Sequence, residues 1–183
     1  MEGIWTGSDY ELTIEFAHKK QMEKAFARLM REPALTNFWM DQQRTVPFRA
    51  PLFEESPMTI VFGALETWPD IFFPCRISAL ALGNLTISIP QNAFAQHFAY
   101  TYPLTLENNP WLAKINDCFI RLATAIYKAV PFLSAAIGEE IAGDITVSNL
   151  FEKDLPNVLM IVPESLLQSV STKPRHKWVQ LLL

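Results

Sequence analysis

The chain opens with a strict alternation of apolar and polar residues over 10–16. A period of two predicts a half-buried strand with one face in water. Apolar residues then recur at helical spacing over 22–30, and Pro33 ends the helix that this spacing predicts. The chain is therefore expected to begin with a strand followed by a helix.

The middle of the chain has the pattern of β-structure. Residues 34–57 hold several prolines, which favours a long surface connection with room for one short strand. Gly83 and Asn84 separate two apolar runs, and this pair is typical of a tight hairpin because both residues tolerate positive φ angles. The elements expected here are a strand over 59–65, a turn over 67–70, strands over 75–82 and 85–89, and a short helix over 91–98.

The longest helix is expected over 110–130. Asn108 or Asn109 would cap it, and Pro110 suits a first turn, where a missing N–H has no cost. Pro131 ends it. Its apolar stripe consists of Leu112, Ile115, Phe119, Leu122 and Ile126.

The last part of the chain predicts more β-structure. The expected elements are strands over 132–141, 145–147 and 158–162, a short helix over 163–170, and an edge strand or frayed end over 178–183. Few strands alternate with long helices, and the middle contains an antiparallel hairpin. The sequence therefore predicts one α+β domain over 1–183, with a twisted antiparallel-rich sheet and one long and two or three short helices on one face.

Composition supports a well-filled core, because 50% of the residues are hydrophobic and 19% are charged. The net charge is −4, and the one basic cluster, Lys173, Arg175 and Lys177, is interpreted as a solvated tail. An acidic chain without a basic stripe is a poor nucleic-acid binder. The start of the chain lacks the pattern of a signal peptide, and no apolar run reaches membrane-spanning length. A cytoplasmic protein with no membrane or nucleic-acid partner is expected.

The residues that usually carry chemistry form no motif. Cys75 and Cys118 lie far apart, without a CxxC pair or a histidine at metal-ligand spacing, so each is expected to be a buried free thiol. Sequence patterns of nucleophile elbows, phosphate-binding loops and zinc proteases are missing. The sequence thus gives no cofactor or metal and favours a protein that is not an enzyme.

An acidic cluster at Glu139, Glu140 and Asp144 is one candidate site. Converging carboxylates could bind a cation or share a proton, with Asp144 as the third group. Neighbours on a strand point to opposite faces, so only one of the two glutamates could face the core. The alternative is a charged edge strand, or a strand end in water.

Histidine and tryptophan side chains supply the other candidates. His97 lies among aromatic residues, and its pKa is easily perturbed, which makes it the histidine closest to a possible cleft. Trp68 and Trp111 lie in or beside expected loops and could anchor a partner or line a pocket. The alternative is that these loops fold back and bury their aromatic side chains in the core.

A segment over 111–143 resembles uncharacterised bacterial proteins of similar size. It carries Tyr127, then the run 130–132 (VPF), then the run 137–140 (IGEE). In those proteins a helix ending in a Tyr-x-x-Val-Pro-Phe-like turn leads into an Ile-Gly-Phe/Glu-Glu-like strand. That family has no established activity, so the resemblance implies no catalytic residue. Small acidic α+β proteins are also frequent among bacterial toxin-immunity proteins.

Three hypotheses follow for function. The first is a non-enzymatic protein-binding module, immunity-like in that an acidic domain masks a partner. The second is an enzyme or small-ligand-binding protein with a pocket between sheet and helix, in which His97 acts with Glu139 or Glu140. The third is a homodimer sealed by the apolar segment over 178–183.

Overall fold

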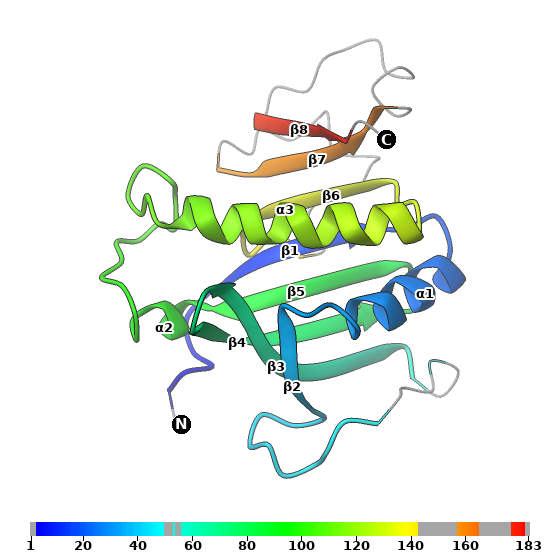
Figure 1. Cartoon of the computed structure of the whole chain (residues 1–183), viewed down its shortest axis with the longest axis horizontal. Coiled ribbons are helices and arrows are strands. Elements are labelled where there is room, and N and C mark those ends of the chain that lie inside the picture. Colours follow the sequence, from blue (N-terminus) through cyan, green and yellow to red (C-terminus); the bar gives the residue numbers. More distant parts are fainter. Residues whose placement is uncertain (1–2, 50–52, 54–55, 143–156, 165–176, 182–183) are drawn as a thin grey trace.

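A computed structural model describes residues 3–49, 53, 56–142, 157–164 and 177–181 of the chain. Figure 1 shows strands and helices in one layered arrangement. The strands are β1 (Asp9–Glu15), β2 (Leu35–Trp39), β3 (Met58–Trp68), β4 (Ile71–Leu80), β5 (Asn84–Pro90), β6 (Ser134–Glu139), β7 (Leu159–Pro163) and β8 (Lys177–Leu181). The helices are α1 (Lys19–Leu29), α2 (Gln91–Phe94) and α3 (Leu112–Ala129).

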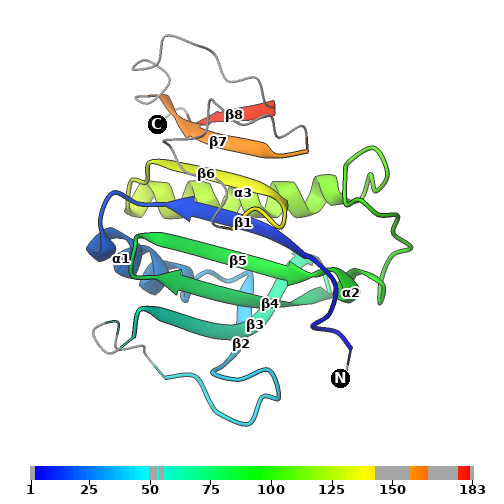
Figure 2. The same cartoon turned by 180° about the vertical axis from the view of Figure 1, so that it is seen from behind.

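All the strands belong to one eight-stranded sheet with the order β2-β3-β4-β5-β1-β6-β7-β8. Every neighbouring pair is antiparallel except β7 and β8, which run parallel. Helices α1 and α3 lie on one face of the sheet, and the view from behind shows the other face without a helix of the described chain (Figures 1 and 2). The predicted α+β class is confirmed.

The core lies between the sheet and the two helices α1 and α3. The predicted stripe of α3 is buried, from Leu112 at 0% exposure to Ile126 at 0%. Phe119 stacks on Tyr10 of β1, with 6.4 Å between ring centroids. An aromatic side chain removes about 150–250 Å² from water, so such contacts dominate the stability of the core.

The start of α3 differs from its predicted cap. Trp111 occupies the N-cap position and gives no side-chain hydrogen bond, so Pro110 precedes the helix. The Asn109 side chain is used elsewhere: its Oδ1 accepts a bond from the Thr101 N–H at 2.8 Å, and its amide donates to the Thr101 carbonyl at 2.8 Å. Asn109 therefore fixes the loop before α3 rather than capping the helix.

The predicted hairpin between β4 and β5 forms, but its turn lies one residue earlier. Leu80 pairs with Asn84, so the loop consists of the three residues 81–83 and Asn84 belongs to the strand. Gly83 has a φ of +103°, and an added Cβ would lie 2.7 Å from the carbonyl oxygen of Phe16. Only glycine suits this position, which explains why the glycine was a good turn marker and the asparagine was not.

Strand β6 lies inside the sheet, between β1 and β7. The interpretation of its glutamates as charges on an edge strand is therefore wrong. The strand ends at Glu139, and Glu140 has a φ of +49°, so the alternation of faces stops there. Strand β8 is the outermost strand at its side of the sheet, which agrees with the edge-strand alternative for 178–183 as far as Leu181; residues 182–183 lie outside the described part of the chain.

Some predicted elements lie outside the described residues. These are the strand over 145–147, Asp144, the basic residues Lys173 and Arg175, and residues 165–170 of the expected helix over 163–170. The first residue of that expected helix, Pro163, is the last residue of β7. Within the described residues, no helix has the length and apolar character needed to span a membrane.

Replacing Phe119 by alanine should lower the free energy of unfolding by about 3–5 kcal/mol, because it removes a fully buried ring and leaves a cavity. Urea denaturation measures this loss. Asp117 is exposed on the same helix, and its replacement by alanine should change the free energy by less than about 0.5 kcal/mol. Equal effects of the two substitutions would contradict the placement of α3.

Candidate functional site

One end of the sheet collects the predicted site residues that the structure describes. Strand β1 begins there, and β3, β5 and β6 end there, beside α2 and the first turn of α3 (Figure 1). This region is called the α2 end. The register fixes it, because Asp9 pairs with Pro90 and Tyr10 pairs with Glu139.

An aromatic cluster forms part of the α2 end. Trp111 stacks on Phe98, with centroids 4.8 Å apart, and Trp68 lies 5.2 Å from Phe98 on the other side. His97 contacts Phe73 edge to face at 5.2 Å. The three aromatic candidates therefore meet through intervening phenylalanines. The cluster consists of Trp68, Phe73, Phe94, His97, Phe98 and Trp111.

The two tryptophans of the aromatic cluster are half-buried and held in place. The indole N–H of Trp111 donates to the carbonyl of Ala99 at 3.3 Å. The ammonium of Lys114 lies 5.4 Å from the centroid of the Trp68 ring, a cation–π contact worth about 0.5–1 kcal/mol at an exposed site. Both rings thus have defined contacts and are still partly accessible, a combination that suits recognition of another molecule.

Glu139 joins three segments of the chain. One carboxylate oxygen accepts a hydrogen bond from the Ser8 hydroxyl, and the other accepts one from the Leu104 N–H at 3.1 Å. Glu140 is exposed, and its N–H donates to the Asp9 carbonyl at 2.9 Å. The two glutamates therefore have different surroundings, and Glu139 fastens the strand end to the N-terminal segment and to the loop before α3.

His97 is exposed and faces a shallow hollow formed by residues 95–100. In the part of the chain that the structure describes, no hydrogen bond or ion pair joins it to Glu139 or Glu140, and no three His, Cys, Asp or Glu side chains are placed to hold a metal ion. The arrangement thus joins His97 to the aromatic cluster rather than to the acidic residues.

A cavity of about 440 Å³ lies between α3, β1, β7 and the loop over 103–108. Inside it, the Tyr10 hydroxyl donates to Asn116 Oδ1 at 2.8 Å, and both residues are buried. Burial raises the pKa of Tyr10, and the nearby charge of Glu139 adds to this, whereas the bond to Asn116 opposes it. The phenol therefore stays protonated near neutral pH and cannot act as a base.

Sequence reasoning missed Asn116 and Glu11. Asn116 was placed off the apolar stripe of its helix, and the outer face of β1 was expected to be in water, yet Asn116 is 5% exposed and Glu11 is 3% exposed. Glu11 accepts hydrogen bonds from the Ser88 hydroxyl at 2.9 Å and the Ala142 N–H at 2.8 Å. Two features of the sequence could have indicated this burial. Asn116 lies next to the apolar stripe of its helix, and Glu11 lies on a strand whose neighbours carry hydroxyl groups.

The cysteines are buried and free, as predicted. Burial raises the pKa of the Cys75 thiol to about 12 and also raises that of Cys118. Because the thiolate is the reactive form, neither residue is activated as a nucleophile.

No family model and no curated protein matches the chain. Among solved structures, a chain of the crystal structure of the toxic C-terminal tip of CdiA from Pseudomonas aeruginosa in complex with immune protein is 10% identical, with a TM-score of 0.42; the match covers 75% of this chain and 89% of that one. The Pseudomonas aeruginosa T6SS protein PA0821 is 12% identical with a TM-score of 0.31, over 72% of this chain and 40% of that one. At these values neither likeness carries information on function.

The bond between Tyr10 and Asn116 should show as energetic coupling. Tyr10→Phe and Asn116→Leu each leave a buried polar group unpaired, so each should cost about 1–3 kcal/mol in unfolding free energy. The double variant should cost less than the sum, with a coupling of about 0.5–3 kcal/mol. Urea denaturation of all four proteins measures this, and additive effects would contradict the bond.

Glu11 should make stability depend on pH. Burial is the main cause that raises the pKa of Glu11 above the ordinary 4.5. The hydrogen bonds from Ala142 and Ser88 lower this pKa, and the charge of Asp9 raises it by a smaller amount. The folded state therefore binds this proton more tightly than the unfolded state. The stability that the proton supplies is present below pH 4.5 and is lost as pH rises through the folded-state pKa.

The Glu11→Gln variant tests this linkage. Its unfolding free energy, relative to wild type, should increase as pH rises from below 4.5 towards neutral. Urea denaturation across this range measures the difference, in which the other titrating groups cancel. Asp117→Asn, at an exposed site, is the matched control. If the difference in unfolding free energy between Glu11→Gln and wild type stays constant with pH, burial does not raise the pKa of Glu11.

Proposed function

We propose that this protein is a non-enzymatic protein-binding module, immunity-like in that it masks a partner, and that it binds through the α2 end. The observation that carries the proposal is the aromatic cluster, in which half-buried Trp68 and Trp111 both pack against Phe98 and remain partly accessible. Tryptophans of this kind are the commonest binding hot spots, because they bury a large area and lose little conformational freedom.

Exposed apolar side chains extend the surface around the cluster. Tyr102 is 68% exposed and Leu106 is 39% exposed, and both lie on the loop that joins α2 to α3. This loop is fastened by Asn109 and by Glu139, so it presents these side chains in a defined position. A pre-organised apolar surface loses less entropy on association than a mobile loop would.

Exposed acidic residues give the same end a partly negative rim, which Lys114 interrupts beside Trp68. Glu107 lies on this loop and Glu140 follows β6, and both side chains face solvent. Rim charges mainly speed association with a partner of opposite charge. We therefore expect a partner with basic residues around an apolar patch, and Glu140→Lys should slow association, whereas Glu139→Lys would also disturb the fold.

Substituting Trp68 tests the proposal. Native mass spectrometry of tagged protein from its own host identifies a stoichiometric protein partner, and calorimetry then gives the affinity. Trp68→Ala should weaken that affinity by about 30-fold, because a hot spot contributes about 2 kcal/mol or more. Circular dichroism and urea denaturation check that the variant remains folded.

The matched control is Leu82→Ala. Leu82 is 90% exposed on the turn between β4 and β5, at the end of these strands opposite the α2 end. The substitution therefore removes apolar surface outside the proposed site. Its affinity should equal that of wild type. If both variants bind the partner as wild type does, the α2 end is not the binding surface.

A small-ligand-binding function is the second candidate, and the cavity beside Tyr10 and Asn116 favours it. It lies between sheet and helix, as this hypothesis requires. A small-molecule adduct in the same mass spectra that is lost in Asn116→Leu would support it.

Pairing of two copies remains a further proposal. Strand β8 is the last strand on its side of the described sheet, so a second copy could extend the sheet there. The same spectra would report the dimer by its mass.

A further inference from the structure

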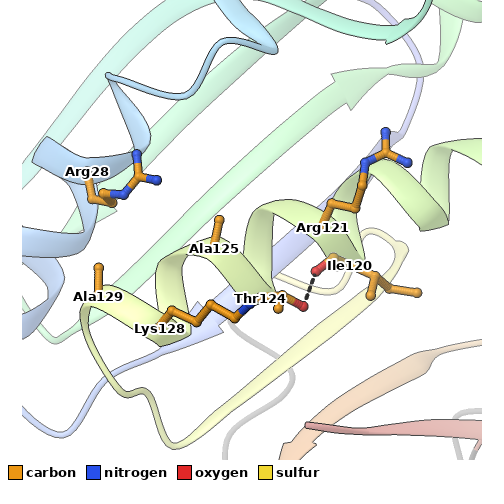
Figure 3. A pocket seen from close by; sticks show the side chains of 7 residues that line it. All are labelled: Arg28, Ile120, Arg121, Thr124, Ala125, Lys128 and Ala129. Carbon is orange, nitrogen blue, oxygen red and sulfur yellow. Dashed lines mark hydrogen bonds between the residues drawn. The ribbon is translucent and has the colours of Figure 1, made fainter. Parts of the chain in front are cut away.

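A second surface lies between α1 and the C-terminal half of α3, away from the α2 end. It is a shallow groove of about 440 Å³. Figure 3 shows Arg28 on α1 opposite Ala125 and Ala129 of α3, with Arg121 farther along the helix. The lining residues are Arg28, Ile120, Arg121, Thr124, Ala125, Lys128 and Ala129, and they are called the helix groove.

The helix groove is basic although the chain is acidic. Three of its lining residues are cationic and none is acidic, while the whole chain has a net charge of −4. Arg121 and Lys128 are exposed, and neither forms an ion pair with another described residue. Arg28 pairs with Glu32 at 2.6 Å, which leaves donors of its guanidinium available. Arg121 and Lys128 therefore bring positive charge to the groove that no ion pair within the described residues neutralises.

The cations have a regular spacing. Arg121 and Lys128 are seven residues apart and lie on one side of α3, about 10 Å apart along the axis. Lys128, in the last turn, also gains from the helix dipole, by about 0.3–1 kcal/mol. Arg121 is in the middle of the helix, where the dipole contributes little, and its side chain also interacts with Cys118.

The floor of the groove is apolar and smooth. Ala125 and Ala129 carry only methyl groups where they face α1, whereas Ile120 projects from the side of α3 away from α1. The hydroxyl of Thr124, which also lines the groove, donates to the Ile120 carbonyl at 2.7 Å. The small alanine residues leave room for a side chain from outside to pack between the helices. A floor of this kind beside spaced cations is complementary to an amphipathic segment that carries both apolar and acidic residues.

We propose that the helix groove binds an acidic amphipathic segment of a partner protein. Charge complementarity with the cations supplies orientation, and the guanidinium groups of Arg28 and Arg121 can each hold a carboxylate through two N–H donors. A single small anion would use one cation and ignore the apolar floor. A nucleic-acid backbone would likewise use the cations and leave the apolar part of the groove uncovered.

The test uses a fluorescein-labelled synthetic peptide in which leucines recur every three or four residues and glutamates fill the other positions, so that one helix face is apolar and the other acidic. A peptide of the same length with lysine in place of each glutamate serves for comparison. Fluorescence anisotropy with the full chain should show binding of the acidic peptide only. Arg121→Glu combined with Lys128→Glu should weaken this binding at least tenfold, and added salt should weaken it further in wild type.

The matched control combines Arg44→Glu with Arg49→Glu. These exposed residues lie between β2 and β3 and do not line the groove, and their substitution changes the net charge by the same amount. It should retain most of the affinity for the peptide. Trp68→Ala should also retain it, since this inference does not rest on the aromatic cluster and can fail or succeed separately.

Three outcomes would overturn the inference. The first is equal binding of the acidic and basic peptides, and the second is an equal loss of affinity in the groove variant and its control. The third is tighter binding of a single-stranded DNA oligonucleotide, or of phosphatidylserine vesicles, than of the acidic peptide. That result would assign the cations of the groove to a phosphate-bearing partner.

Discussion

The burial of β1 on both faces is the constraint on which the rest of the structure depends. Five consecutive residues of this strand, 10–14, are buried, and β5 and β6 pair with it on either side. Its apolar residues face α3, while Glu11 and Thr13 on the other face are satisfied by hydrogen bonds to Ser88, Ala142 and Thr86. Shifting the strand by one residue would bury these polar groups against α3 without partners, so the register is fixed.

The fixed register also builds the α2 end. Because Tyr10 is opposite Glu139, the end of β6 comes beside the start of β1, and the Glu139 carboxylate reaches Ser8 and Leu104. The loop before α3 is therefore positioned by the same strand that organises the core. The aromatic side chains of α2, of the loop after it and of the N-cap of α3 then meet those of β3 and β4 without needing a local motif.

Much of the fold follows from local patterns. The stripe of α3, the alternation of β1 and the glycine at position 83 each reflect a rule that acts within a few residues. The places that were not predicted depend on distant partners. Glu11 is buried because Ser88 and Ala142 are present to bond it, and Asn109 does not cap α3 because Thr101 uses its amide.

The candidate site shows the same division. The sequence identified Trp68, Trp111 and His97 as separate side chains in or near loops, and the structure shows that one phenylalanine-rich layer joins them. Nothing in the spacing of positions 68, 97 and 111 indicates that they meet, since their proximity depends on the order of the strands. The acidic pair at 139 and 140 could be seen in the sequence. The sequence did not indicate that the backbone geometry at Glu140 would give the two residues different surroundings.

Helix α3 separates two kinds of surface by its length. Its N-cap residue, Trp111, belongs to an aromatic, acid-rimmed end, and its later turns contribute Arg121 and Lys128 to a basic groove. At a rise of 1.5 Å per residue, Trp111 and Lys128 are about 25 Å apart, well beyond the screening length of roughly 8 Å at physiological salt. The negative rim therefore does not cancel the positive groove. An acidic net charge can coexist with a local preference for anions, and the charge of the whole chain is a poor guide to what each surface binds.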